Sequence, residues 1–210
     1  MAHQPDLTKP IALFGGTFDP IHLGHIQIAH DIQTTYSLAE VRFIPNWQPV
    51  HRATPTATCE QRLAMLALAL ENDPLFKIDY SEIQRKGPSY TIDTLEILRK
   101  QLPYTPFCFI LGMDAWLELT TWHRYEAILD QAHLIIAARP HYTLSNTGKI
   151  AALLKQHQTD DPSTLKNVLG GKIIFHPTTA IDISATAIRN KLAHDEDIQS
   201  LLPKKVFDNV

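Results

Sequence analysis

Short apolar runs rich in branched residues alternate along this chain with longer amphipathic stretches, and no other feature of the sequence limits its possible folds as much. Such runs are typical of buried parallel strands, and the stretches between them are typical of the helices that connect those strands. The pattern therefore predicts an α/β fold, with an open parallel sheet and helices on both of its faces.

Apolar spacing and the residues that stop each run predict the individual elements. Ile92, Leu95 and Leu98, for example, fall along one side of a helix. We expect strands at 11–14, 41–45, 77–83, 107–112, 133–139 and 172–177. We expect helices at 25–36, 60–72, 91–102, 114–119, 124–129, 148–157 and 184–192, and an apolar segment at 198–207 that covers the core.

With 210 residues, of which 44% are apolar, the chain is long enough to bury one sizeable core. We expect a single domain at 11–210 after a flexible lead-in at 1–10 that does not resemble a secretory signal. The net charge of -3 favours neither nucleic acid nor a membrane as a partner, and no apolar run is long enough for a membrane helix. Two cysteines are too few for a disulfide framework, which favours the reducing cytoplasm. The oligomeric state stays open.

The stretch FGGTFDPIHLGH, residues 14–25, follows the first predicted strand directly. Gly15 and Gly16 would let the backbone turn sharply and a ligand approach closely, and amides at the start of the next helix favour an anion. If that helix begins near Pro20, His22 and His25 share a face of its first turn and can both point at one phosphate chain. Gly24 between them would leave the helix surface bare for a flat base or ribose.

The same residues have plainer explanations, because a glycine pair can be a tight turn and histidines can bind metal. A zinc site would need a third ligand, and the other histidines show no recognisable metal spacing (His30, His51, His123 and His176). We therefore assign no metal ligand directly. Asp19, which precedes a proline, is more typical of a turn or cap residue than of a catalyst.

The stretch DISATAIRN, residues 182–190, follows the last predicted strand after a few residues. Ser184 can cap the helix that begins there, Thr186 lies within its first turn, and Arg189 can reach phosphate oxygens with its fork of donors. Alone, this would be an ordinary capped helix with a solvated arginine. Paired with the glycine-histidine stretch, it predicts a second side of a triphosphate site.

Together, GGTFDPIHLGH and ISATAIR resemble the HxGH and ISxTxIR signatures of the nucleotidylyltransferase superfamily. Further segments resemble nicotinate-nucleotide adenylyltransferases: PNWQPVHR, RLAMLALA, RKGPSYTIDTL, GMDAWLELTTWHRYEAIL, ARP and LLPKKV. The resemblance spans about residues 11–206 and implies a Rossmann-like α/β fold of the nucleotidylyltransferase type. It also implies the transfer of the adenylyl group of ATP to nicotinate mononucleotide, with Mg2+ as the cofactor, in NAD biosynthesis.

The resemblance also implies roles for individual residues. Catalytic roles fall to His22, His25 and Arg189. ATP binding falls to Gly15, Gly16, Thr17, Phe18, Gly24, Gly112, Asp114, Ser184 and Thr186. Nicotinate mononucleotide binding falls to His51, Arg52, Ser89, Tyr90, Thr91, Trp122 and His123.

Two positions depart from the family pattern. Pro49-Val50-His51-Arg52 stands where the family often has two prolines before the basic pair, which leaves the stiffness of this loop open. His123 stands where tyrosine is common after the tryptophan, and offers less aromatic area to the nicotinate ring. The alternatives are an adenylyltransferase acting on nicotinamide mononucleotide or on another phosphorylated acceptor such as phosphopantetheine, a cytidylyltransferase, and a non-catalytic sensor of adenine nucleotides or NAD.

Overall fold

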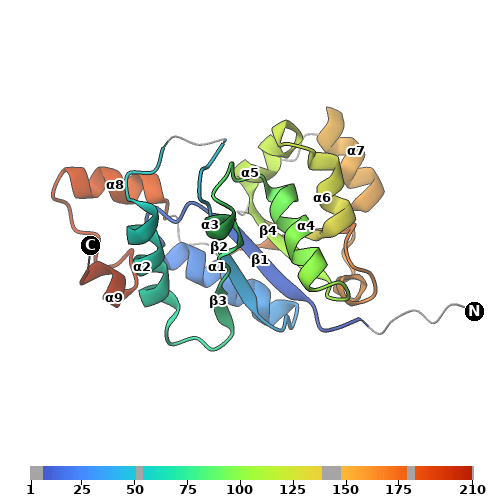
Figure 1. Ribbon diagram of the computed structural model, residues 1–210, viewed down its shortest axis with the longest axis horizontal. Helices are drawn as coiled ribbons and strands as arrows, with labels where there is room; N and C mark the ends of the chain where they lie inside the picture. Colours follow the sequence, from blue (N-terminus) through green and yellow to red (C-terminus); the bar gives the residue numbers. More distant parts are fainter. Residues whose placement is uncertain (1–6, 51–53, 139–147, 179–182, 210) are drawn as a thin grey trace, which may run out of the picture.

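The computed structural model describes residues 7–50, 54–138, 148–178 and 183–209 of the chain. Its strands are β1 (Ile11–Gly16), β2 (Val41–Pro45), β3 (Phe76–Ile78), β4 (Phe107–Gly112), β5 (His133–Ala138) and β6 (Ile173–Pro177). They form one six-stranded sheet in the order β3-β2-β1-β4-β5-β6, and every neighbouring pair is parallel. The predicted α/β fold with an open parallel sheet is confirmed (Figure 1).

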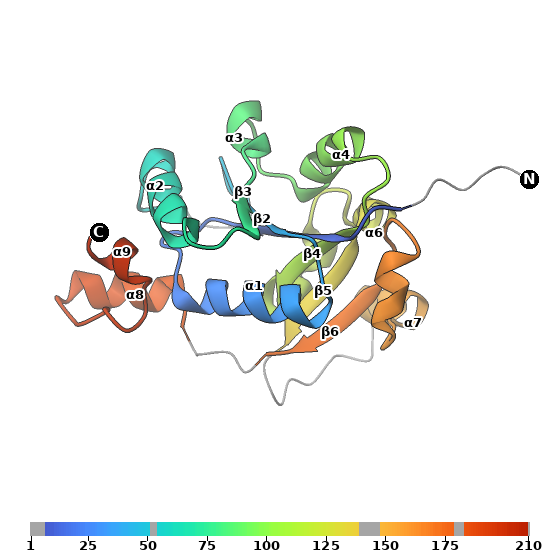
Figure 2. The same cartoon turned by 90° about the horizontal axis from the view of Figure 1, so that it is seen from below.

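Helices connect the strands and lie on both sides of the sheet. They are α1 (Leu23–Thr35), α2 (Cys59–Leu70), α3 (Ser81–Arg85), α4 (Thr91–Gln101), α5 (Met113–Glu118), α6 (Tyr125–Gln131), α7 (Gly148–His157), α8 (Ala185–Ala193) and α9 (Lys204–Phe207). Short 3-10 helices occur at Leu119–Thr121 and Pro162–Lys166. Figure 2 shows α1 and α4 on opposite sides of the sheet.

Successive strand side chains point to opposite faces, and this alternation gives the sheet two cores. Ala12 and Phe14 of β1 pack with residues of α1, α2 and α8, whereas Ile11 and Leu13 pack with residues of α4, α5 and α6. Buried residues from the predicted apolar segment at 198–207 complete the first core, which confirms that the segment covers it (Ile198, Leu202 and Val206).

The strand predicted at 77–83 is wrong in its second half. The strand covers only Phe76–Ile78, and Ser81–Arg85 forms the short helix α3. The Asp79 carboxylate accepts a hydrogen bond from the Ser81 amide at 2.9 Å, which closes a local turn and ends the strand. The turn places Glu82 in the interior, where its Oε1 accepts a hydrogen bond from the Thr94 hydroxyl of α4 at 2.8 Å.

Candidate active site

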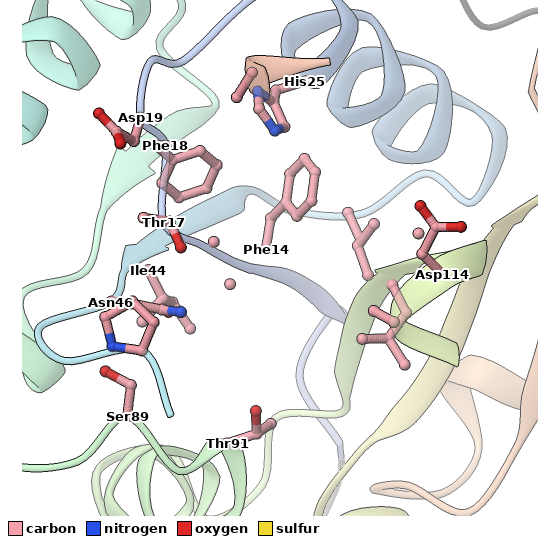
Figure 3. A pocket seen from close by; sticks show the side chains of 18 of the residues that line it. Phe14, Thr17, Phe18, Asp19, His25, Ile44, Asn46, Ser89, Thr91 and Asp114 are labelled. Atoms are coloured by element: carbon pink, nitrogen blue, oxygen red, sulfur yellow. The ribbon is translucent and has the colours of Figure 1, made fainter. Parts of the chain in front are cut away.

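A cavity of about 790 Å³ lies where the strand order reverses, at the carboxyl ends of β1 and β4. Parallel α/β sheets bind ligands at this position, and a cavity of this size can hold a small-molecule ligand. In Figure 3, His25 and Asp19 lie on one side of the cavity, Ser89 and Thr91 lie on the opposite side, and Asp114 marks a third side. Segments far apart in the sequence thus meet around one space.

The two glycines that end β1 are needed for packing rather than for a turn. A Cβ on Gly15 would come within 3.2 Å of the Phe109 ring, and one on Gly16 would come within 2.9 Å of the Phe18 ring. Both glycines belong to the strand, and the chain turns at Phe18, whose φ of 49° lies in the left-handed region. The sharp turn predicted at the glycines is therefore wrong in position by two residues, although both glycines line the cavity.

His22 and His25 form a stacked pair at the start of α1. Their ring centroids are 3.7 Å apart, and the His22 amide donates to His25 Nδ1 at 3.3 Å. A neutral His25 ring with this bond carries its proton on Nε2. The helix begins at Leu23 rather than near Pro20, so His22 is its N-cap and not part of its first turn. The rings still share one side of the helix start, and both line the cavity.

Both histidines are held neutral. Burial lowers the pKa of His22 from its usual 6.5 to about 4. Burial, together with the nearby His22, keeps the pKa of His25 well below 6.5. His22 Nδ1 has no hydrogen-bond partner among the described residues, so this buried polar atom can bind a ligand. The pair is therefore equipped to donate hydrogen bonds rather than to carry a fixed charge.

The missing side chain of Gly24 leaves room for the His22 ring beside it. A Cβ at this position would lie 3.1 Å from His22 Nδ1 and 3.2 Å from its Cε1. Gly24 also lines the cavity. The glycine therefore fixes where the histidine ring can lie, a role that the sequence did not suggest.

Asp19 and Arg189 join the two predicted sides of the site. Both Asp19 carboxylate oxygens accept backbone hydrogen bonds, from the Thr56 amide at 2.7 Å and the Ala57 amide at 3.1 Å. This agrees with a structural role for Asp19 rather than a catalytic one. One guanidinium nitrogen of Arg189 donates to the Asp19 carbonyl at 2.6 Å, and the other donates to the Thr186 hydroxyl at 3.2 Å.

The start of α8 is built as the sequence predicted. The Ser184 hydroxyl caps the helix by accepting a hydrogen bond from the Ala187 amide at 3.1 Å. Ser184, Thr186 and Arg189 all line the same cavity as the histidine pair, although some 160 residues of chain separate the two stretches.

Gly112 and Asp114 lie at the carboxyl end of β4. Gly112 ends the strand and is the N-cap of α5, and a Cβ added to it would meet nothing within 4 Å. Its open side faces the space that a ligand could fill. Asp114 is exposed in the first turn of α5 and lines the cavity, where its carboxylate can accept hydrogen bonds from hydroxyl groups.

Ser89, Tyr90 and Thr91 form the wall opposite the histidine pair. The Ser89 hydroxyl accepts a hydrogen bond from the Gln48 amide at 3.1 Å, so it joins this wall to the segment after β2. Tyr90 is the N-cap of α4 without a side-chain cap bond, and Thr91 is the first residue of that helix. The Thr91 hydroxyl points toward the cavity (Figure 3).

Aromatic side chains border this wall. The rings of Tyr90 and His123 lie 4.5 Å apart at an angle of 37°. Trp122 is partly buried against the core around α4 and also lines the cavity. His51 and Arg52, also predicted to bind the mononucleotide, lie outside the described residues, although Pro49 and Val50 before them line the cavity.

Asn46 and Glu82 are among the lining residues that were missed from the sequence. Asn46 follows β2 directly, and its backbone amide donates a hydrogen bond to the Gly16 carbonyl at 2.9 Å (Figure 3). Its position after a predicted strand could have marked it as a residue of the carboxyl edge of the sheet. Glu82 is only 4% exposed, and burial raises the pKa of its carboxyl group despite nearby hydrogen-bond donors. No local signal marked Glu82, because its segment was predicted as a strand.

Comparison with known proteins shows the family to which this chain belongs. The model of a family described as cytidylyltransferase-like matches residues 13–191. A protein of Aeromonas salmonicida named "Probable nicotinate-nucleotide adenylyltransferase" is 47% identical over 204 residues, which cover 97% of this chain and 95% of that protein. The chain belongs to the nicotinate-nucleotide adenylyltransferase family. A protein of the same name from Salmonella gallinarum is 43% identical and covers 95% of this chain and 94% of its own length.

Solved structures agree with this assignment at the level of the fold. The nicotinic acid mononucleotide adenylyltransferase of Plasmodium falciparum, solved in complex with NaAD, superimposes with a TM-score of 0.71 at 18% identity. The match covers 96% of this chain and 94% of that one. The same enzyme in complex with APC gives a TM-score of 0.69 at 19% identity. The resemblance on which the sequence analysis relied is thus confirmed.

Nicotinate-nucleotide adenylyltransferases are nucleotidyltransferases, which typically use a divalent metal. Within the described ranges of this chain, no group of three or more histidine, cysteine, aspartate or glutamate side chains could hold such an ion by itself. The described helices also include none with the length and apolarity that crossing a bilayer requires.

Proposed function

We propose that the cavity binds ATP and nicotinate mononucleotide side by side and transfers the adenylyl group between them, giving nicotinate adenine dinucleotide and pyrophosphate. One observation carries the proposal. The stacked pair His22–His25 and the start of α8 with Arg189 line the same cavity, and they are joined through Asp19. This arrangement offers several hydrogen-bond donors to a single chain of phosphates.

ATP takes the half of the cavity between β1, α5 and α8. Its triphosphate meets the histidine pair, Arg189 and the helix start with Ser184 and Thr186. Its adenosine lies against Gly112 and Asp114. Gly112 leaves open space beside the ligand, and the Asp114 carboxylate can accept hydrogen bonds from the ribose hydroxyls. The remaining residues proposed for ATP lie at the end of β1, in the segment after it and at the start of α1 (Gly15, Gly16, Thr17, Phe18 and Gly24).

Nicotinate mononucleotide takes the opposite half. The start of α4 favours an anion, so the nicotinate carboxylate lies against the Thr91 hydroxyl and the backbone amides around Tyr90. The Trp122 ring suits stacking on the electron-poor pyridinium. Ser89 and His123 border the ring, and we propose His51 and Arg52 for the phosphate of the mononucleotide.

The reaction needs positioning and charge stabilisation more than it needs a general base. The nucleophile is a phosphate oxygen of the mononucleotide, and a phosphate monoester with a second pKa of about 6 is mostly ionised near pH 7. It attacks the α-phosphorus of ATP in line, and the bond to the pyrophosphate breaks. His22 donates a hydrogen bond to the α-phosphate as negative charge develops, and His25 and Arg189 hold the departing oxygens.

The cavity fits a nucleotide-bound Mg2+ rather than an ion held by the protein alone. Mg2+ is usually bound through phosphates with one or two carboxylates. Asp114 presents an exposed carboxylate to the cavity, whereas both oxygens of Asp19 already accept backbone hydrogen bonds. We therefore place Asp114 ahead of Asp19 as the residue that meets the ion, directly or through water. When bound, the ion neutralises phosphate charge.

We also propose that residues 11–210 form a single domain that works in the reducing cytoplasm. The family model spans 13–191, and one sheet carries the described elements from β1 to β6. Cys59 and Cys108 are both free thiols, and a reducing compartment keeps cysteines in this state.

The deciding experiment measures pyrophosphate release by the purified protein with ATP and Mg2+. Nicotinate mononucleotide, nicotinamide mononucleotide and phosphopantetheine are compared as acceptors in parallel. We expect a strong preference for nicotinate mononucleotide, because a site built for one polar group rejects its analogues. Preference for another acceptor would refute the assignment of Thr91 and Trp122, and no release with any acceptor would favour a nucleotide sensor.

A further inference from the structure

Arg62 is a charged side chain buried behind the wall of the cavity. It lies on α2 on the same inward side as Leu66 and Leu70, and only 2% of its surface is exposed. Within the described residues, no carboxylate lies within ion-pair distance of its guanidinium group. A buried arginine normally needs such a partner, because its charge loses hydration. The side chain therefore needs another explanation.

The guanidinium group holds two backbone carbonyls on neighbouring strands. One terminal nitrogen donates to the Thr17 carbonyl at 2.7 Å, and the other donates to the Asn46 carbonyl at 2.8 Å. Thr17 follows β1 directly and Asn46 follows β2 directly, so both mark the carboxyl edge of the sheet. Hydrogen bonds from a charged donor are stronger than those between neutral groups, so Arg62 ties these two strand ends together.

These bonds also decide which way the two carbonyls point. Thr17 and Asn46 line the cavity, whereas Arg62 does not. The carbonyl oxygens bonded to Arg62 are therefore turned toward the interior and away from the cavity. A carbonyl oxygen carries partial negative charge and would repel a phosphate that it faced. By holding both oxygens behind the wall, Arg62 keeps this part of the cavity suitable for anions.

The segment that Arg62 holds reaches both halves of the proposed site. Toward ATP, the Asn46 amide donates to the Gly16 carbonyl at 2.9 Å. Toward the mononucleotide, the Gln48 amide donates to the Ser89 hydroxyl at 3.1 Å, and the Ser89 amide donates to the Gln48 carbonyl at 2.9 Å. Arg62 is thus one hydrogen bond from the ATP half, through Thr17, and two hydrogen bonds from Ser89 in the mononucleotide half.

We propose that Arg62 is a positioning residue that aligns the ATP and mononucleotide halves of the site with each other. It touches neither substrate and acts through Thr17 and Asn46. The inference rests on the proposed function, because in-line transfer needs the two substrates to be aligned and Arg62 is proposed to hold the residues that align them. A misplacement of about 1 Å far from the reacting atoms can cost about a hundredfold in rate.

The test compares Arg62→Lys and Arg62→Met with Leu66→Ala. Leu66 is buried one turn further along the same helix, and its side chain makes no hydrogen bond to Thr17 or Asn46. Lysine keeps the charge but cannot hold two carbonyls with a planar fork. Denaturation curves first establish a temperature at which all variants are folded. There we expect Arg62→Lys to lower kcat/KM by about tenfold to a hundredfold for both substrates, and Leu66→Ala to leave both values close to the wild type.

A different role for Arg62 would give a different pattern. Unchanged kcat/KM in folded Arg62→Lys, a loss confined to one substrate, or an equal loss in Leu66→Ala would each overturn the inference. Calorimetric titration with ATP alone provides a second measurement that does not need turnover. We expect weaker ATP binding in Arg62→Lys than in Leu66→Ala, and equal affinities would also overturn it. An inactive wild type would contradict the proposed function instead.

Discussion

His133 is expected to make the fold less stable as the pH falls from 7 to 5. Its side chain is completely buried at the start of β5. Nδ1 accepts a hydrogen bond from the Lys172 amide at 3.2 Å, and Nε2 lies 3.0 Å from the Val168 carbonyl, so the ring is placed as a neutral donor and acceptor. Burial, more than the nearby positive charges, lowers its pKa from 6.5 to about 4. Protonation would break the bond from Lys172.

Stability falls with falling pH because the unfolded chain binds a proton on His133 at a higher pH than the folded chain does. The unfolded chain takes up a proton on this histidine near pH 6.5, whereas the folded chain does so only near pH 4, so stability is present above pH 6.5 and lost as the pH falls. At about 1.4 kcal/mol for each pH unit of difference, the full effect approaches about 3 kcal/mol at low pH. Between pH 7 and pH 5, His133 alone should remove about 2 kcal/mol from the free energy of unfolding.

Urea unfolding, followed by tryptophan fluorescence at pH 7, 6 and 5, measures this effect. His133→Asn cannot titrate, so we expect its deficit relative to the wild type to shrink by about 2 kcal/mol between pH 7 and pH 5. His194→Gln is the control, because it removes a histidine that is exposed on the surface. A constant difference between the wild type and His133→Asn would refute the reasoning. So would a wild type that gains stability as the pH falls.

Three substitutions test the site itself. His22→Ala should lower kcat by about a hundredfold or more with a smaller change in KM, because a donor to the developing charge is lost; steady-state kinetics with both substrates measures it. Gly24→Ala places a Cβ 3.1 Å from His22 Nδ1, so the ring must shift, and we expect a loss of about tenfold in kcat with little change in Tm. Thr91→Val keeps the shape but removes the hydroxyl, so KM for nicotinate mononucleotide should rise by about tenfold or more while KM for ATP stays the same.

Much of the fold could be predicted because its signals are local. The strands expected at 41–45 and 107–112 match β2 and β4 residue for residue. The cap expected at Ser184 is present, because a serine before an amphipathic stretch can satisfy a free amide three residues later without help from the rest of the chain. The meeting of the two signature stretches was also predictable, since carboxyl ends of parallel strands share one edge.

The missed features depend on partners that are distant in the sequence. Arg62 lies on an amphipathic helix, where an arginine is normally solvated, and its two carbonyl partners come from other connections. Gly15 suggested a turn, but the ring that excludes a side chain at this position comes from Phe109 of β4. Which aromatic ring fills the space beside a glycine is a property of the packed sheet. It is not encoded in the few residues around that glycine.

The way the helices meet explains how a chain with a net charge of -3 can take two anionic substrates. The N-cap residues of α1, α4 and α8 all line the cavity, namely His22, Tyr90 and Ser184. Each helix start offers backbone amides and the positive end of its dipole. The buried histidines stay neutral, so much of the attraction comes from oriented dipoles, with Arg189 as a nearby full charge. Because dipoles are fixed by the fold, the proposed site can favour the charge of the transition state without a strongly basic surface.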